Sequence, residues 1–357
     1  MNSLDNKTKK KHLTQLAHYH KYLYKHPELR NLFIEMTVLC NERCRHCGSH
    51  CGEIVPKDML TKDEICSFID YINQNFPKKP MLCITGGEPL LRPDLFEIMT
   101  YATELGFRWG MTSNGTLIDD DVAEKLRLAG MRTISISIDG LPETNDWFRC
   151  TENGYNDAMR GVRALVNNGA FSHVQVTTVV HKKNIDELPE LYKILSKENL
   201  RSWRVINIEP IGRAKTQPEL LLDKDDYIKM FDFIKKYRHA NNMEVMYGCS
   251  HYLGIELERE VRPWYFLCNA GTYTASVMFN GDIGACLDIE RRPELIQGNI
   301  RTDDFKTVWE KKFRPFRNRS HRCKGCKHEK YCDGDSFHTW DFENNKPELC
   351  FKGILFD

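Results

Sequence analysis

The stretch TVLCNERCRHCGSHCGE, residues 37–53, places Cys40, Cys44, Cys47 and Cys51 within twelve positions. It overlaps the end of the run LFIEMTVLC, which is apolar enough to form a buried strand. Four thiols this close together are rarely needed for packing, so they indicate either disulfide bonds or a metal site. The first three have the spacing C-x3-C-x2-C, and the rest of the chain has to decide between the two chemistries.

The composition favours a metal. The chain has 357 residues, fourteen cysteines and a formal net charge of +1. No uncharged run approaches the roughly 18 residues of a membrane helix, and the N-terminal segment lacks the apolar core of a secretory signal. We therefore expect a cytoplasmic protein without a membrane partner, where cysteines stay reduced. The near-neutral charge argues against nucleic acid as a partner.

Downstream of residue 31, apolar β-rich runs alternate with amphipathic stretches of helical spacing. Thr61 and Glu64, for example, form a capping-box pattern at the start of one such stretch. Six strand–helix units in series predict parallel strands in a barrel or an open sheet. The expected strands are 32–40, 81–87, 107–115, 133–140, 173–180 and 202–212, and the expected helices are 61–76, 93–105, 119–129, 155–168, 186–199 and 223–240. A further amphipathic helix is expected at 11–25.

Polar motifs fall at the ends of these expected strands. In parallel βα folds the carboxyl ends of the strands form the ligand-binding face. We therefore expect the side chains of the motifs to lie near one another and near the cysteine loop. The motifs are Gly86-Gly87-Glu88-Pro89, Ser113-Asn114-Gly115, Ser137 with Asp139, and Glu209-Pro210.

Two metals fit the first cysteines. Cys40, Cys44 and Cys47 can hold three corners of a cubane iron–sulfur cluster and leave the fourth iron open. Zinc is the competing metal, since structural zinc takes four ligands and Cys51 is available as the fourth. The spacing alone leaves both readings open.

The alternation of strands and helices stops after about residue 241. The remainder has short strand-like pieces, TASVMF and DIGACL, together with glycine turns and seven of the fourteen cysteines. A small module held together by metal fits this composition.

The C-x3-C-x2-C motif after the first strand, followed by GGEP at the end of the second, resembles the radical S-adenosylmethionine superfamily. The resemblance covers residues 32 to about 240. It implies a partial (β/α)6 TIM-like barrel in which Cys40, Cys44 and Cys47 hold a [4Fe-4S] cluster whose open iron binds S-adenosylmethionine. The implied cofactor-binding residues are Gly86, Gly87, Glu88, Pro89, Ser113, Asn114, Ser137, Asp139 and Arg149. Of these, Ser113 and Arg149 are expected at the cofactor carboxylate, and Ser137 with Asp139 near the ribose.

The C-terminal cysteines resemble the SPASM domain, an auxiliary-cluster module of radical enzymes. The pattern CKGCKHEKYC, followed by a last cysteine, implies a [4Fe-4S] cluster on Cys323, Cys326, Cys332 and Cys350; zinc is the alternative metal there. The division that follows is an N-terminal helical extension at 1–30, a radical barrel at 31–241 and an auxiliary-cluster domain at 242–357.

The first auxiliary cluster of that pattern is incomplete. Its expected cysteines are replaced by Ser336 and Thr274, so that Cys268 and Cys286 remain. Either this cluster is absent, or Cys249 joins the pair in a three-thiolate site with an open iron. The chain is thus expected to hold at least one auxiliary cluster, with two as the alternative.

The resemblance implies a radical oxidoreductase whose 5′-deoxyadenosyl radical abstracts hydrogen from a substrate. We favour a ribosomally made precursor peptide, which the enzyme crosslinks or oxidises, with flavodoxin or ferredoxin as electron donor. Only some thirty residues precede the first strand, so a separate leader-recognition protein is considered.

Two other functions remain as alternatives. One is a radical enzyme acting on a small molecule such as a sugar or amino-acid derivative, and the other is a zinc-stabilised binding module. Sulfatase maturation fits poorly, because Leu287 stands directly after Cys286, where those relatives have an aspartate. Asp288, two positions after Cys286, is the candidate for a catalytic residue.

Overall fold

The computed structural model describes residues 4–49, 51–319 and 322–357. Its main element is a sheet of ten strands in the order β10-β9-β8-β1-β2-β3-β4-β5-β6-β7. The strands β1 to β8 run parallel to one another, whereas β9 is antiparallel to its neighbours β8 and β10. The bounds are β1 Asn31–Glu35, β2 Met81–Thr85, β3 Trp109–Ser113, β4 Thr133–Ser137, β5 His173–Val180, β6 Ser202–Asn207, β7 Glu244–Tyr247, β8 Thr274–Val277, β9 Asp282–Gly284 and β10 Gly298–Asn299.

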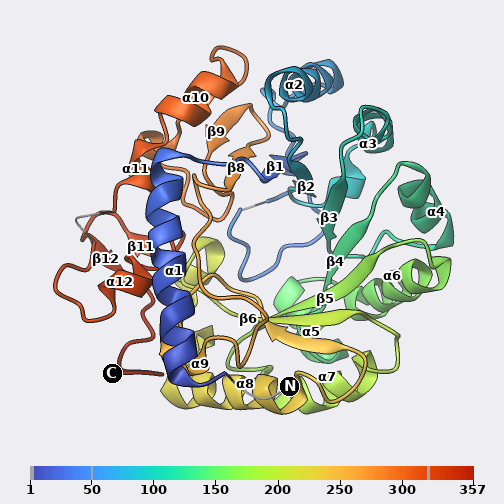
Figure 1. Cartoon of the computed structure of the whole chain (residues 1–357). Coiled ribbons are helices and arrows are strands. Elements are labelled where there is room, and N and C mark those ends of the chain that lie inside the picture. The colour runs from blue at the N-terminus through green and yellow to red at the C-terminus, as the bar shows by residue number, and fades with distance from the viewer. Residues whose placement is uncertain (1–3, 50, 320–321) are drawn as a thin grey trace.

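Helices follow the strands and pack on the outside of the curved sheet (Figure 1). Thr61 caps the first of them through the expected capping box with Glu64. Each predicted strand–helix unit is present, and the strands curl into the partial barrel that the resemblance implied. The helices are α2 Lys62–Asn75, α3 Leu95–Glu104, α4 Asp120–Leu128, α6 Gly154–Asn168, α7 Leu188–Leu195 and α8 Lys224–Tyr237.

The sequence prediction missed helix α5, Pro142–Arg149. Proline at its first position has a φ angle suited to a helix start, and Cys150 ends the helix in the left-handed conformation. The helix lies between β4 and α6 in the chain, so this crossover has two helices where one was expected. Its last residue, Arg149, is thereby brought to the cysteine loop.

The C-terminal part of the chain contributes to the main sheet as well as forming small elements of its own. The pieces TASVMF and DIGACL form β8 and β9, and β8 pairs with β1 in parallel, with Ile34 opposite Val277. This pairing covers the edge of β1, which would otherwise expose its hydrogen-bonding groups. The remaining elements are short: α9 Gly254–Leu257, α10 Phe305–Lys311, α11 Arg314–Arg317, α12 Glu329–Cys332, β11 Trp340–Asp341 and β12 Lys346–Pro347.

Helix α1, Asn6–Lys25, lies beside this C-terminal part and contacts α9 and α12 (Figure 1). Its buried residues include Leu13 and Leu23, as the helical spacing predicts, and also Lys9 and His20. None of the helices within the described residues is long and apolar enough to cross a bilayer.

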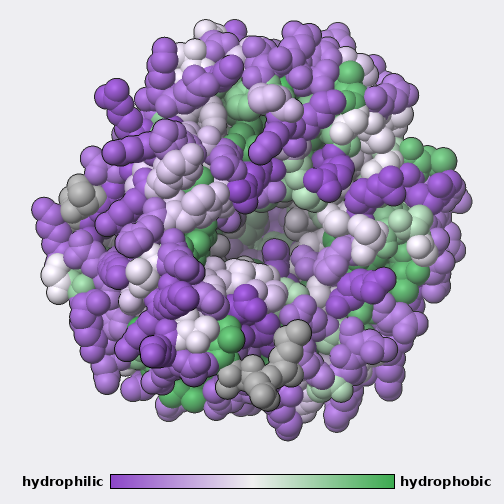
Figure 2. Space-filling view, in the orientation of Figure 1, coloured by the Kyte–Doolittle hydropathy of each residue, from purple (hydrophilic) through white to green (hydrophobic). Residues whose placement is uncertain are grey.

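The two faces of each strand have different surroundings because successive side chains point in opposite directions. On β1, Leu32 and Ile34 are fully buried among apolar residues, whereas Phe33 and Glu35 line the inside of the barrel. The inside contains a cavity of about 870 Å³. The space-filling view is hollowed near the middle of the face shown (Figure 2). All strands from β1 to β6 therefore present alternate side chains to one internal space.

Candidate metal centre

The loop that carries the first cysteines is closed at its base and held from both sides. Leu39 pairs with Gly52 in an isolated bridge, so the loop returns to the point where it leaves β1. The side chain of Arg213 donates to the carbonyl oxygen of Cys44 at 2.7 Å, and its backbone N–H donates to that of Cys47 at 3.1 Å. With the carbonyl groups bound on one side, the side chains of Cys40, Cys44 and Cys47 line the cavity.

The GGEP turn packs directly on this loop. A Cβ atom on Gly86 would lie 2.3 Å from the carbonyl oxygen of Thr37, and one on Gly87 would lie 2.0 Å from that of Leu39. The next residue, Glu88, donates its backbone N–H to Leu39 O at 2.7 Å. The glycines are thus required by the close approach of two protein backbones, and both also line the cavity.

Glu88 joins the GGEP turn to the end of β3. Its carboxylate accepts hydrogen bonds from the Ser113 hydroxyl at 2.9 Å and from the backbone N–H of Asn114 at 2.8 Å. Ser113 and Asn114 line the cavity, whereas Glu88 and Pro89 lie behind it. The expected roles of these residues in cofactor binding remain predictions. The structure adds that Glu88 fixes the turn in place.

Arg149 lies at the centre of a buried group of charges. Its guanidinium is paired with the carboxylates of Glu42 at 2.7 Å and Asp139 at 2.6 Å. Asp139 also accepts from the backbone N–H of Val179 at 2.7 Å. Arg149 therefore connects the cysteine loop, through Glu42, to the end of β4. Ser137 and Arg149 line the cavity and Asp139 does not, so the expected contacts of Arg149 with a cofactor carboxylate and of Asp139 with a ribose stay predictions.

Cys51 and Cys47 interact through their thiols. A hydrogen bond from Cys51 is the largest cause that lowers the pKa of Cys47, to about 4, whereas burial raises the pKa of Cys40 to about 11. The thiol of Cys51 thus favours the thiolate form of Cys47, which is the form that binds metals. The sequence made Cys51 available as a fourth zinc ligand, and here its thiol interacts with that of Cys47.

A second group of thiols faces the same cavity from the C-terminal side. Cys249, Cys268 and Cys286 all line it, together with Asp288. The thiol of Cys286 lies 3.7 Å from the carboxylate of Asp288. Burial, the largest single effect, raises the pKa of Cys268, but the charge of Arg319 and hydrogen bonds from the backbone together lower it overall. All three cysteines thus face the cavity, and whether they bind a cluster remains a prediction.

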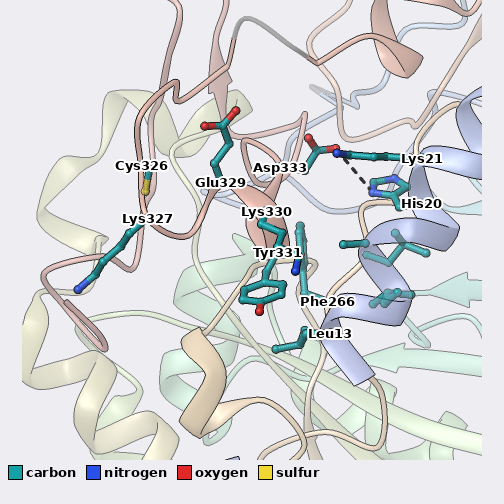
Figure 3. A pocket seen from close by; sticks show the side chains of 13 residues that line it. Leu13, His20, Lys21, Phe266, Cys326, Lys327, Glu329, Lys330, Tyr331 and Asp333 are labelled. Atoms are coloured by element: carbon teal, nitrogen blue, oxygen red, sulfur yellow. Dashed lines mark ion pairs between the residues drawn. The ribbon is translucent and has the colours of Figure 1, made fainter. Parts of the chain in front are cut away.

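The third group, Cys323, Cys326, Cys332 and Cys350, lies outside this cavity. Burial is the largest cause that raises the pKa of Cys323, and the neighbouring charge of Cys350 adds to it. Cys326 lies at the rim of a pocket of about 400 Å³ between α1 and the C-terminal part (Figure 3). In the same pocket His20 lies 3.7 Å from Asp333, and burial lowers the pKa of His20 to about 3, so its ring is neutral.

The buried guanidinium of Arg322 lies near the auxiliary cysteines and bears on whether an anionic group fits there. Arg322 is 2% exposed, and its three nitrogens have no hydrogen-bond partner among the described residues. Its guanidinium stacks on Trp340, 3.6 Å from the ring centre. Burial and the charge of Arg319 lower its pKa to about 10, and the charges of Cys268 and Cys323 oppose that shift. Iron–sulfur clusters with thiolate ligands are anions whose sulfurs accept hydrogen bonds. The surroundings of Arg322 therefore fit such a cluster.

Sequence reasoning missed several charged groups of the site. Glu42 is an unspecified position inside the cysteine motif, and only its burial and its contact with Arg149 single it out. Arg204 and Arg213 lie outside any recognised motif, so only their contacts single them out. Glu209 was noted at a strand end, but its partners His251 and His338 were not. No short motif joins these residues, because they come from three distant segments of the chain.

Comparison with protein-family models gives two matches. Residues 34–195 match the Radical SAM superfamily, and residues 268–327 match SPASM, an iron–sulfur cluster-binding domain. The first match includes Cys40, Cys44 and Cys47 and the GGEP turn, and the second includes Cys268 and Cys286.

Several curated proteins are similar over most of the chain. The AdoMet-dependent heme synthase of Methanosarcina barkeri is 30% identical over 320 residues, which cover 84% of this chain and 89% of that protein. The mycofactocin maturase MftC of Mycolicibacterium smegmatis is 29% identical over 318 residues, covering 84% and 76%. Among solved structures, Streptococcus suis SuiB bound to precursor peptide SuiA has a TM-score of 0.72 at 18% identity and covers 96% of this chain and 80% of its own. That last likeness shows the fold alone.

Proposed function

The chain belongs to the radical S-adenosylmethionine superfamily and carries a SPASM iron–sulfur domain, and from this premise we propose that it abstracts hydrogen from a carboxylate-bearing substrate held in the barrel cavity. The family implies a [4Fe-4S] cluster with S-adenosylmethionine and auxiliary clusters. The proposal rests on one observation. A single cavity is lined by Cys40, Cys44 and Cys47, by the two GGEP glycines and by Arg204.

Cys40, Cys44 and Cys47 are proposed to hold the first cluster, and the C-terminal cysteines an auxiliary one. When bound, the first cluster with S-adenosylmethionine supplies a 5′-deoxyadenosyl radical. The residues of the chain then have two tasks. Arg213 and the Glu42–Arg149 pair hold the cysteine loop in place, and the strand side chains hold the substrate against it. An external donor such as flavodoxin or ferredoxin is proposed to supply the electron.

Arg204 is the residue that we propose binds the substrate. It lies on β6 and faces the cavity, where its Nε donates to the Thr177 hydroxyl at 3.1 Å. Burial lowers its pKa, and no described carboxylate lies within ion-pair distance of it. A half-buried guanidinium without such a partner favours an anionic ligand, and Arg binds carboxylates through two parallel hydrogen bonds.

An iron tetrapyrrole is the substrate class that we place first. The heme synthase of Methanosarcina barkeri is the relative at 30% identity that this chain matches almost end to end. Tetrapyrroles of that kind carry carboxylate side chains, which suit Arg204. The cavity volume of about 870 Å³ lies in the range of small-molecule and cofactor sites. A tetrapyrrole is a small molecule, and the sequence analysis gave a small-molecule substrate as the alternative to a precursor peptide.

A precursor peptide is the second candidate, and it is the one that the sequence favoured. It is supported by the similarity to mycofactocin maturase MftC at 29% identity. The fold shared with SuiB, solved with its precursor peptide, is compatible with it. For this candidate a separate leader-recognition protein remains part of the proposal.

One assay separates the candidates. The anaerobically reconstituted enzyme is incubated with S-adenosylmethionine and dithionite, with iron coproporphyrin III or with short peptides encoded beside its gene. We expect iron coproporphyrin III to increase 5′-deoxyadenosine formation, because each hydrogen taken from the porphyrin converts one 5′-deoxyadenosyl radical to 5′-deoxyadenosine. Arg204→Gln should raise KM for it more than it lowers kcat. A peptide that alone increases turnover would replace the tetrapyrrole, and failure to form any 5′-deoxyadenosine would overturn the proposal.

A further inference from the structure

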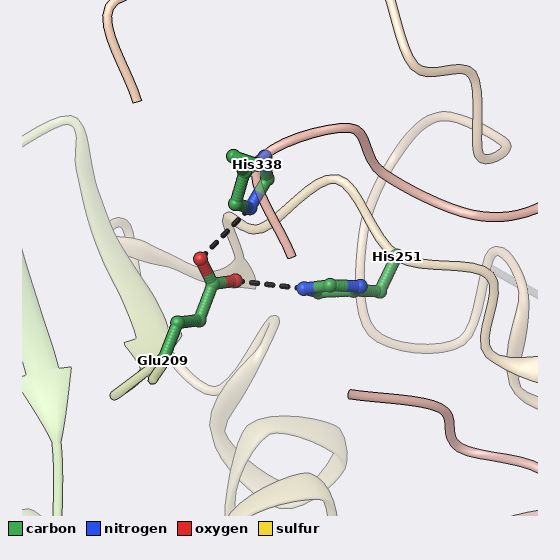
Figure 4. A group of neighbouring side chains, drawn as sticks. All are labelled: Glu209, His251 and His338. Carbon is green, nitrogen blue, oxygen red and sulfur yellow. Dashed lines mark hydrogen bonds and ion pairs between the residues drawn. The ribbon is translucent and has the colours of Figure 1, made fainter. Parts of the chain in front are cut away.

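We propose that Glu209, His251 and His338 bind one divalent transition-metal ion, separate from the iron–sulfur clusters. Glu209 follows β6, His251 follows β7, and His338 precedes β11. The carboxylate of Glu209 lies between the two rings, 2.7 Å from His251 Nε2 and 2.8 Å from His338 Nε2 (Figure 4). One ligand atom from each residue lies within 4.8 Å of the others.

The surroundings of His251 support ligation. Its other ring nitrogen, Nδ1, lies 3.1 Å from the carboxylate of Asp335, and the side chain is fully buried. A ring that donates its Nδ1 proton to Asp335 presents the lone pair of Nε2 to Glu209 and His338. Histidines that bind metals almost always make such a second hydrogen bond to a carboxylate or carbonyl group, because it fixes the tautomer and the ring orientation.

The site is open on one side. Glu209 and His338 line the barrel cavity, whereas His251 lies behind them. Two histidines and one carboxylate, with further positions left for water or substrate, are the ligands of several open zinc and iron sites. The open positions would face the same cavity as the first cysteines, so a group of the substrate is able to reach the metal.

The alternative is a set of buried ion pairs in which both imidazoles are protonated. It places two positive rings on one carboxylate, with Asp335 balancing the second charge. A divalent ion replaces both ring protons without changing the total charge of the group. Metal binding therefore keeps the charge balance of the ion pairs, and the open position beside the cavity is what favours the metal.

The test uses the reconstituted holoenzyme and Zn²⁺ alone as the probe. After incubation with Zn²⁺ and gel filtration, elemental analysis should find one zinc per chain in addition to the cluster iron. His338→Gln and Glu209→Gln should each lose the zinc and keep the iron. Asp335→Asn should weaken zinc binding by about 10- to 100-fold, the usual effect of removing a carboxylate behind a ligand. His239→Gln, a histidine that is exposed on the surface, is the matched control and should keep the zinc.

X-ray absorption at the zinc edge of the wild-type protein gives a second readout that does not depend on any variant folding. Nitrogen and oxygen neighbours at about 2.0–2.1 Å, without sulfur, are expected. A sulfur shell at about 2.3 Å would place the zinc on the cysteines and overturn the proposal. So would the absence of stoichiometric zinc, or its retention in both ligand variants. None of these outcomes bears on the formation of 5′-deoxyadenosine, so the two proposals fail separately.

Discussion

Cys51 shares its loop with Cys40, Cys44 and Cys47, and all four thiols line the cavity. The hydrogen bond with Cys47 and burial both raise the pKa of Cys51. Burial also raises the pKa values of Cys40 and Cys44, so protonation does not separate Cys51 from the other three thiols. Its separation from the three ligands rests on the C-x3-C-x2-C motif and stays a prediction.

Single cysteine variants test this separation. Cys40→Ala, Cys44→Ala and Cys47→Ala should each abolish the formation of 5′-deoxyadenosine from S-adenosylmethionine with dithionite, because a cubane cannot be held on two thiolates. Cys51→Ala should keep most of the activity, with a rise in the pKa of Cys47 as its main effect. Chromatographic measurement of 5′-deoxyadenosine decides. Wild-type rates in any of the first three variants would contradict the assignment.

A second prediction about a single residue concerns Arg322. A buried cation near an anionic cluster stabilises its reduced, more negative form, so Arg322→Met should lower the reduction potential of an auxiliary cluster. We expect a decrease of about 59 mV or more, which for one electron is a tenfold change in the equilibrium constant. A redox titration followed by electron paramagnetic resonance measures it. If every potential stays unchanged, Arg322 has no cluster beside it.

At the scale of elements, the GGEP turn and the cysteine loop depend on one another through backbone contact. Gly87→Ala would place a methyl group 2.0 Å from the carbonyl oxygen of Leu39, so the loop has to move. We expect the variant to lose about four irons per chain, the content of one cubane, and to stop cleaving S-adenosylmethionine. Gly52→Ala is the control in the same loop, because its methyl group meets nothing within 4 Å. Equal iron content in both variants would show that the contact is not needed.

The elements that the sequence predicted best are those whose patterns are local. The capping box at Thr61 and the apolar runs of β1 to β6 depend on neighbours in the chain, and all of them are present. Helix α5 was missed because its eight residues are mostly polar and begin with Pro142. The pairing of β8 with β1 joins residues more than two hundred positions apart, and no local pattern encodes such a pairing. The same holds for Glu209, His251 and His338.

At the scale of the whole molecule, the three groups of cysteines occupy two environments. The first group and the trio Cys249, Cys268 and Cys286 face a common cavity from opposite parts of the chain, whereas the last four cysteines lie outside it. β8 pairs with β1 and continues toward Cys286, so the C-terminal part of the chain also forms a wall of the barrel. A cluster on the trio would therefore lie next to the substrate, and one on the last four would not.

Counting iron in multiple variants determines how many clusters the molecule holds. A variant lacking Cys40, Cys44 and Cys47 should keep about four irons per chain if only Cys323, Cys326, Cys332 and Cys350 bind a cubane, and about eight if the trio binds one too. Zinc in place of iron, or no metal, would contradict both.

Replacing Cys249 determines whether Cys249, Cys268 and Cys286 hold a cluster. It lies outside the family pattern, but it lines the same cavity as Cys268 and Cys286, and burial raises its pKa strongly, which an adjacent metal would reverse. The buried cation Arg319 beside Cys268 favours a negatively charged group there. We therefore expect the variant that lacks Cys40, Cys44 and Cys47 to hold about eight irons per chain, and to lose about four of them when Cys249→Ala is added. A cluster with an open iron should also change its electron paramagnetic resonance signal when a small thiol is added, since the open position can take a new ligand. Unchanged iron content after Cys249→Ala would reduce Cys249, Cys268 and Cys286 to packing residues, because two remaining thiols cannot hold a cubane.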